Sequence, residues 1–196
     1  MYSFFQSYVI WKMKRSFQSV KLTGEFIDRG IPVLLICNHM SWWDGIWAFY
    51  FNQEKLHRKF HFMMLENQLR KNWFFRFTGG FSVTKKNKSI IETINYAVEL
   101  LQNSENVVLM FPQGKIQSMH LHKIRFEKGI AKIMEKTTKP VQIVMLANFI
   151  DYFSEVKPKL NIYFEEFFGK PDLKDLELTY NDFFRRCIQQ QQQIRS

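Results

Sequence analysis

Three stretches of the chain are almost continuously apolar but too short for helices of ordinary length. They are PVLLICN (32–38), NVVLMF (106–111) and PVQIVMLA (140–147). Val, Ile, Leu and Met fill these stretches without the alternation of a half-exposed strand, which indicates strands buried on both faces. Such strands occur in parallel sheets that helices cover on both sides. These runs therefore restrict the possible folds more than any other feature of the sequence.

The remaining segments supply the other elements of such a fold. Further strands are expected at 60–65, 80–83 and 159–167, with a possible edge strand at 21–26. Helices are expected at 42–54, 66–77, 88–103, 126–137 and 172–193, the last ending in a glutamine run that we expect to be frayed. Strands that alternate with helices predict an α/β fold, with a mostly parallel central sheet of about six or seven strands flanked by helices. With no linker or repeat, we predict one domain over residues 1–196.

The charge balance favours anionic partners. Lys and Arg outnumber Asp and Glu by 28 to 18, which gives a net charge of +10. A field of this sign attracts anionic lipid headgroups, an acidic carrier protein or nucleic acid. No polybasic block or nucleic-acid motif is present, so nucleic acid is the least favoured partner. Cys37 and Cys187 form no disulfide or metal pattern, which favours a reducing cytoplasm.

The N-terminal segment, residues 1–19, combines aromatic residues with a basic end. Its sequence MYSFFQSYVIWKMKRSF carries Lys12, Lys14 and Arg15 behind the apolar part, and it lacks a small-residue cleavage site. Two interpretations remain: an interfacial helix in the lipid headgroup layer, or an ordinary helix packed on the domain. No apolar run reaches the roughly 20 residues that span a bilayer. We therefore expect a peripheral, monotopic protein on the cytoplasmic face of the inner membrane.

The segment CNHMSWWDGIW (37–47) places a histidine just beyond a predicted buried strand. His39 is followed five positions later by Asp44, and PQGK (112–115) follows another buried strand. Ligands of open α/β sheets bind outside the carboxyl ends of the strands. A neutral imidazole there can accept a proton from an attacking hydroxyl or amine, and a neighbouring carboxylate fixes its tautomer. The alternative is a histidine in a turn and an aspartate in a first helical turn, without a catalytic role.

Four blocks of sequence resemble those of one enzyme family. NHMSWWD (38–44) looks like the N-H-x4-D block of the glycerolipid acyltransferases of the lysophosphatidic-acid type. GGFSVTK (79–85), FPQGK (111–115) and FEKG (126–129) stand where that family has G-G-(I/V)-F-(V/I)-x-R, F-P-E-G-T-R and F-K-x-G. The order and spacing of the blocks agree over about residues 20 to 150.

The resemblance implies transfer of an acyl chain from acyl-coenzyme A or an acyl-carrier protein to a hydroxyl or amine of a lipid-like acceptor at a membrane surface. It makes His39 the general base and Asp44 its orienting partner, with no acyl-enzyme, metal or other cofactor. The implied substrate-binding residues are Lys85, Phe111, Pro112, Gln113, Gly114 and Lys115. The residues expected to contact the acyl chain or the membrane are Trp42, Trp43, Trp47, Trp73 and Phe74. Trp43 and Trp47, four residues apart, also fit the core-facing stripe of one helix.

This sequence departs from the family at positions associated with the acceptor's phosphate. Gln113, Lys115 and Ile116 replace the glutamate, threonine and arginine of the glycine block. Lys85 replaces the arginine of the preceding block, and Ile143 replaces a later proline. Arginine binds phosphate through two parallel hydrogen bonds, whereas lysine offers a point charge. We therefore expect an acceptor other than standard lysophosphatidic acid. The alternative is a non-catalytic protein that binds lipid or carrier on a diverged acyltransferase fold.

Overall fold

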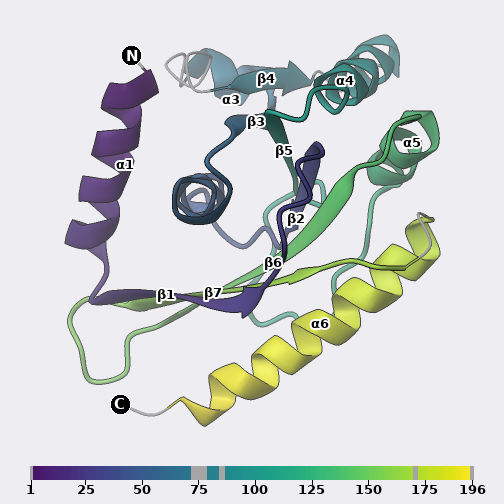
Figure 1. The fold of residues 1–196 in the computed structure, drawn as a ribbon. Coiled ribbons are helices and arrows are strands. Elements are labelled where there is room, and N and C mark those ends of the chain that lie inside the picture. The colour runs from purple at the N-terminus through teal and green to yellow at the C-terminus, as the bar shows by residue number, and fades with distance from the viewer. Residues whose placement is uncertain (1, 72–78, 84–86, 170–171, 195–196) are drawn as a thin grey trace.

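A computed structural model describes residues 2–71, 79–83, 87–169 and 172–194, and its centre is a seven-stranded sheet (Figure 1). The strand order is β1-β7-β6-β2-β5-β3-β4. Neighbouring strands pair in parallel except β6 and β7, which pair antiparallel. The strands are β1 (Ser19–Glu25), β2 (Val33–Cys37), β3 (Lys59–Leu65), β4 (Gly80–Val83), β5 (Asn106–Met110), β6 (Gln142–Asp151) and β7 (Lys159–Glu166). The prediction of a mostly parallel sheet is confirmed, and the N-terminal strand β1 is an edge strand as expected.

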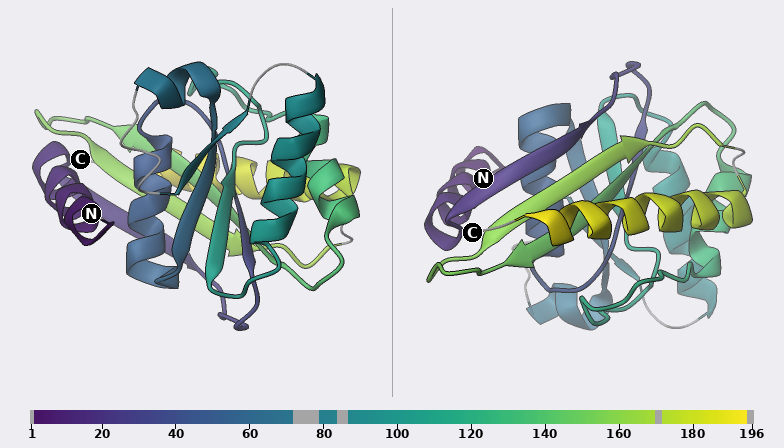
Figure 2. Two further views of the ribbon diagram at one scale, coloured as in Figure 1. Left: turned by 90° about the horizontal axis from the view of Figure 1, so that it is seen from above. Right: turned by 90° about the horizontal axis from the view of Figure 1, so that it is seen from below.

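Helices cover both faces of this sheet (Figure 2). They are α1 (Tyr2–Ser16), α2 (Asp44–Phe51) with a π-helical continuation η1 (Asn52–Leu56), α3 (Glu66–Lys71), α4 (Asn87–Leu100), α5 (Lys128–Lys136) and α6 (Leu173–Gln193). Side chains of α1 and α2 pack in one hydrophobic cluster, and side chains of α4, α5 and α6 pack in another on the opposite face. Within the described ranges, no helix has the length and apolar character needed to cross a membrane.

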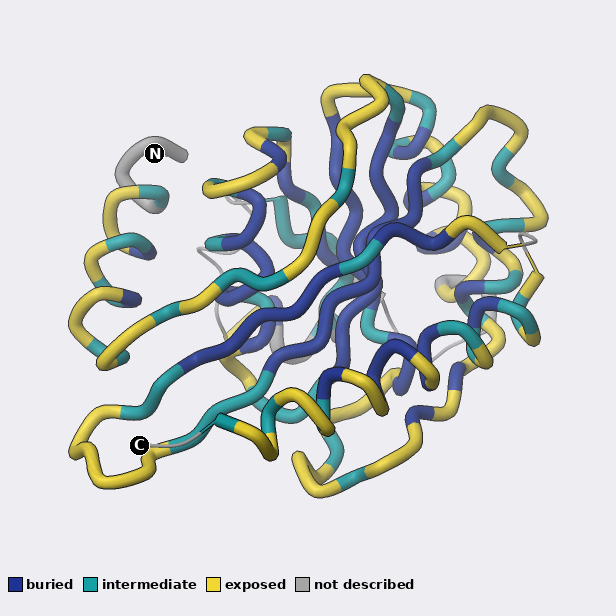
Figure 3. The backbone as a smooth tube through the Cα atoms, turned by 60° about the horizontal axis from the view of Figure 1, so that its bottom comes forward, coloured by how far each residue is buried: buried dark blue, intermediate teal, exposed yellow. Residues whose placement is uncertain are grey.

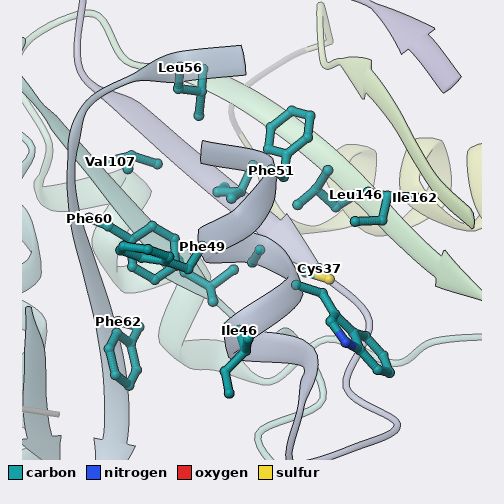
Figure 4. Close-up of a cluster of buried hydrophobic side chains, with 14 of the residues drawn as sticks. Cys37, Ile46, Phe49, Phe51, Leu56, Phe60, Phe62, Val107, Leu146 and Ile162 are labelled. Atoms are coloured by element: carbon teal, nitrogen blue, oxygen red, sulfur yellow. The ribbon is translucent and has the colours of Figure 1, made fainter. Parts of the chain in front are cut away.

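Strand β2 joins the two clusters. All five of its residues are buried, as the unbroken apolar run predicts. Leu35 and Cys37 face the cluster beneath α2, whereas Leu34 and Ile36 face the cluster beneath α4 and α6. Figure 4 shows the first cluster, where α2 lies over Cys37 and contributes Ile46 and Phe49. Because β2 is held from both sides, the turn that follows it starts from a fixed position.

Helix α2 begins later than expected, and helix α6 is regular where we expected fraying. Helix α2 begins at Asp44 rather than residue 42, and Ser41 Oγ accepts a hydrogen bond from the Trp43 amide at 3.1 Å. Helix α6 continues through the glutamine run to Gln193, where we expected fraying. Gln191 is held there by a 3.0 Å hydrogen bond from the Tyr163 hydroxyl and by its own bond to Asp151. The predicted helix at 66–77 is seen as far as Lys71, and its remainder lies outside the described residues.

Candidate active site

The two polar turns predicted at one edge of the sheet do lie together. Strands β2 and β5 are parallel and in register, with Ile36 opposite Met110, so both chains leave the sheet at the same edge. The His39 ring stacks on Phe111 there, with ring centroids 4.0 Å apart and an interplanar angle of 12°. The turn after β5 thus supplies one wall of the histidine's surroundings.

His39 and Asp44 form a direct pair. His39 Nδ1 lies 2.9 Å from Asp44 Oδ2. The Asp44 side chain is fully buried, whereas the His39 side chain is 19% exposed. A carboxylate on this side requires Nδ1 to carry a hydrogen, so in the neutral ring the lone pair is on Nε2. The arrangement leaves Nε2 as the nitrogen available for proton transfer.

Asp44 also organises the turn that carries His39. Its Oδ2 accepts the backbone N–H groups of Met40 at 2.7 Å and Ser41 at 2.8 Å. Burial raises the pKa of Asp44, while hydrogen bonds from His39, Ser41 and Met40 oppose that change by stabilising the carboxylate. The second oxygen, Oδ1, is buried and has no hydrogen-bond partner within the described chain. Within the described chain, Asp44 therefore makes its side-chain hydrogen bonds through Oδ2.

Gln113 is turned away from solvent and holds the main chain of His39. The residue is 4% exposed. Its Oε1 accepts the His39 backbone N–H at 2.5 Å, and its Nε2 donates to Gln117 Oε1 at 2.9 Å. The Gln117 backbone N–H donates in turn to the His39 carbonyl at 2.9 Å. Because a backbone N–H only donates, the carbonyl end of the Gln113 amide must face His39. Gln113 is thus a support of the histidine turn.

The backbone conformation at position 114 and the space around it favour glycine. Gly114 has a φ of +63°, which disfavours residues with a Cβ, and an added Cβ would lie 3.1 Å from Glu127 Cγ. The Glu127 backbone N–H donates to the Pro112 carbonyl at 2.8 Å, just before α5. The glycine turn is therefore fixed between His39 on one side and the start of α5 on the other.

The other predicted site residues fall into three groups. Trp42 and Trp43 are 42% and 38% exposed and pack edge to face 5.2 Å apart, and Lys115 is also exposed. Trp47, in contrast, is 2% exposed and packs edge-on against Phe17 in the core, so the expected membrane contact is wrong for this residue. It occupies the core because α2 turns that face onto the sheet. Lys85, Trp73 and Phe74 lie outside the described residues.

Sequence reasoning missed an asparagine pair that anchors the residue before His39. Asn38 Oδ1 accepts the Asn148 backbone N–H at 2.8 Å, and Asn38 Nδ2 donates to the Asn148 carbonyl at 3.2 Å. The Asn148 side chain donates to Cys37 Sγ at 3.2 Å. Burial raises the pKa of the Cys37 thiol well above its ordinary value, which disfavours the thiolate. The signal for it was the asparagine that follows a buried apolar run and opens the NHMSWWD block.

A cavity of about 600 Å³ lies away from this chemistry. It is lined by the end of β1 and by Phe26, Phe164 and Phe168, together with the Arg29–Glu166 ion pair at 2.9 Å. Strand β1 runs opposite to β2, because β7 pairs parallel with β1 but antiparallel with β6. The cavity is therefore at the edge opposite His39.

The support from Gln113 yields a first prediction. Gln113→Ala removes the acceptor for the His39 N–H. Because a hydrogen bond of ordinary strength contributes about 1 kcal/mol, we expect kcat to fall by about tenfold. Gln113→Glu replaces the amide oxygen by a carboxylate oxygen that can still accept that N–H, so we expect it to keep most of the wild-type rate. Steady-state kcat and KM, measured with the melting temperature, check this. Gln190→Ala, an exposed site on α6, is the matched control. An unchanged kcat in Gln113→Ala would contradict the supporting role.

Comparison with known proteins agrees with this geometry. A family model described as Acyltransferase matches residues 19–147, which contain His39, Asp44 and the glycine turn. A 1-acyl-sn-glycerol-3-phosphate acyltransferase of Streptococcus pneumoniae is 28% identical over 109 residues, covering 54% of this chain and 38% of that protein. The match therefore spans well under half the length of that relative.

The fold has a solved counterpart. The crystal structure of the 1-acyl-sn-glycerophosphate acyltransferase PlsC from Thermotoga maritima superposes with a TM-score of 0.64 and 18% identity. The similarity covers 97% of this chain and 79% of the PlsC chain. At this level of identity the likeness establishes the shared fold.

Proposed function

Because this chain belongs to the acyltransferase family, we propose that it transfers an acyl chain from an acyl thioester to a hydroxyl or amine of a lipid-like acceptor, with His39 as general base. The observation that carries this proposal is the His39–Asp44 pair, 2.9 Å apart at the edge of the sheet. A buried carboxylate behind a partly exposed imidazole suits general-base catalysis, because it fixes the tautomer and stabilises the imidazolium.

The proposed reaction needs only groups of this chain and its two substrates. His39 Nε2 accepts the proton of the acceptor hydroxyl or amine as its oxygen or nitrogen attacks the thioester carbonyl carbon. Asp44 holds the ring and stabilises the imidazolium that forms. The tetrahedral intermediate then collapses, the carbon–sulfur bond breaks, and the imidazolium returns the proton to the thiolate. We propose no acyl-enzyme, metal or further cofactor, and the donor is acyl-coenzyme A or an acyl-carrier protein.

The acceptor that we propose is not standard lysophosphatidic acid. At the turn after β5, Lys115 is exposed and Ile116 is 51% exposed. This turn therefore presents a flexible ammonium and an apolar side chain at the two positions where the block that the sequence resembles has threonine and arginine. A site built this way binds an anionic group less specifically than paired arginine hydrogen bonds do.

A membrane surface is the proposed location of the acceptor. Helix α1 buries Val9 and Met13 in the core, while Tyr8 and Trp11 on its outer side are 43% and 54% exposed. Lys12 Nζ lies 5.4 Å from the ring of exposed Trp43. Aromatic rings with neighbouring cations are the residues that settle at the headgroup layer. One side of the helix thus packs on the domain, and we propose the interfacial interpretation for the exposed side. We propose a peripheral, monotopic association with the cytoplasmic face of the inner membrane.

The proposed function predicts a specific pattern of products. Purified protein is incubated with labelled acyl-coenzyme A or acyl-carrier protein and either lysophosphatidic acid or a total lipid extract, and mass spectrometry identifies the acylated species. We expect a labelled lipid other than phosphatidic acid, and a yield lower by about 10²–10⁴-fold with the His39→Ala variant. Phosphatidic acid as the only labelled product would contradict the acceptor proposal. Binding to lipid without turnover across the panel would favour a non-catalytic lipid-binding protein.

A further inference from the structure

The hairpin between β6 and β7, residues 152–158, exposes apolar side chains. Tyr152 is 59% exposed, Phe153 39% and Val156 94%. The Glu155 backbone N–H closes the turn by donating to the Tyr152 carbonyl at 2.9 Å. Phe153 has a φ of +47°, which is unfavourable for a bulky side chain. Figure 3 shows this segment as an exposed loop beyond the buried strands. Exposure of these apolar side chains to water is thus unfavourable, and burying them would stabilise the tip.

The hairpin lies beside α1 and at the same edge of the sheet as His39. Strand β6 is parallel to β2, so the hairpin follows the end of β6 at the edge where the His39 turn follows β2. The Gln18 backbone N–H, just after α1, donates to the Pro158 carbonyl at 2.8 Å, and Ser19 pairs with Lys159. In Figures 1 and 2, α1 and the hairpin project at the same end of the molecule. The hairpin and the C-terminal end of α1 therefore lie side by side.

We propose that the tip of this hairpin inserts into the lipid headgroup layer as a second membrane contact beside α1. The inference rests on the proposed function, whose membrane face it extends. Lys159 Nζ lies 5.2 Å from the Phe153 ring, and Lys157 is exposed next to Val156, so ammonium groups border the apolar tip. Such side chains reach headgroup phosphates while their neighbours enter the apolar layer. The nearby acids are Glu155, which is exposed, and Asp151, which is bonded to Gln191.

The consequence of two contacts is a defined orientation. A single surface helix allows the domain to roll about the helix axis. A hairpin that projects from the end of the sheet removes that freedom and sets the His39 edge relative to the lipid. The hairpin thus affects acceptors that are embedded in a bilayer, whereas an acceptor dissolved in water reaches His39 without it.

The test uses the full chain and vesicles of phosphatidylglycerol with phosphatidylethanolamine. Val156→Asp and Tyr152→Ser, singly and together, are measured by co-sedimentation. Burial of one such side chain makes a difference of about tenfold in partitioning, so we expect at least that loss in the double variant. Leu178→Asp, at a 56% exposed apolar site on α6, is the matched control and should bind like the wild type. Retention within twofold of the wild type in the double variant would overturn the proposal.

A second readout separates this proposal from the catalytic one. The double variant should transfer acyl groups to a short-chain acceptor below its critical micelle concentration at the wild-type rate, and to the vesicle-embedded acceptor at a reduced rate. Equal losses with both acceptors would overturn the orienting role. If the wild type shows no transfer but binds vesicles through Val156, the hairpin contact stands and the proposed enzyme function fails.

Discussion

Replacing His39 by alanine is expected to lower acyl transfer by about 10²–10⁴-fold, the range that positioned general bases contribute. The variant removes the nitrogen that accepts the proton, whereas the turn retains its other anchors. Gln113 still accepts the residue-39 backbone N–H, and Asp44 still accepts those of Met40 and Ser41. The measurement is the rate of thioester consumption in the presence of acceptor, with release of the free thiol as the readout.

Two controls make this result specific. The melting temperature of His39→Ala should stay close to that of the wild type. The variant loses a partly exposed ring stacked on Phe111 and its hydrogen bond to Asp44, but Asp44 keeps the N–H groups of Met40 and Ser41. His122→Ala removes an exposed imidazole from the loop after the glycine turn and should leave the rate unchanged. Full activity in His39→Ala would exclude the imidazole as the base, even though the chain has the acyltransferase fold.

The central sheet was predictable because burial on both faces leaves a direct record in the sequence. Strand β2 must be apolar at every position, since Leu34 and Leu35 pack on opposite faces. The parallel pairing of β2 with β5 then follows from the helices between them, and it places His39 beside the turn after β5. The pairing of His39 with Asp44 is equally local, because only four residues separate them in the chain.

The inward role of Gln113 was not predictable in the same way. Its partners, the backbone groups of His39, are 74 positions away in the chain. A motif comparison assigns a role by position and says nothing of the direction in which the amide points. The glutamine run of α6 illustrates the same limit, since its order depends on Asp151 and Tyr163 of the sheet.

The tryptophans show how position along one helix changes the burial of a side chain. A spacing of four places Trp43 and Trp47 on one face only if both are helical. Trp43 is the N-cap of α2 with helical backbone angles, and its carbonyl accepts the Trp47 N–H at 3.0 Å. Trp43 nevertheless stays 38% exposed at the end of the helix, while Trp47, one turn further along, enters the core. Helix α2 begins two residues later than expected, after a turn whose Met40 and Ser41 N–H groups donate to Asp44.

Asp44→Asn is expected to reduce acyl transfer by at least about 10²-fold with little change in stability. The amide oxygen can keep the hydrogen bonds from Met40, Ser41 and His39, but it no longer offers a charge to the imidazolium. Burial raises the pKa of Asp44, which means that the charged form is costly in this site, and the neutral amide removes that cost. The amide NH₂ takes the place of Oδ1, which has no partner within the described chain, and this loss opposes the gain. We therefore expect a melting temperature within about 4 °C of the wild type.

Asp44→Ala, by contrast, should lose both activity and stability. The backbone N–H groups of Met40 and Ser41 lose their acceptor, at about 1–3 kcal/mol for each group that stays unsatisfied. Thermal unfolding and thioester consumption, measured on the asparagine and alanine variants in parallel, separate the two contributions of this carboxylate. Equal activity in wild type and Asp44→Asn would contradict a role for its charge. A stable but inactive Asp44→Ala would instead show that the turn holds His39 without these hydrogen bonds, through Gln113 and Asn38.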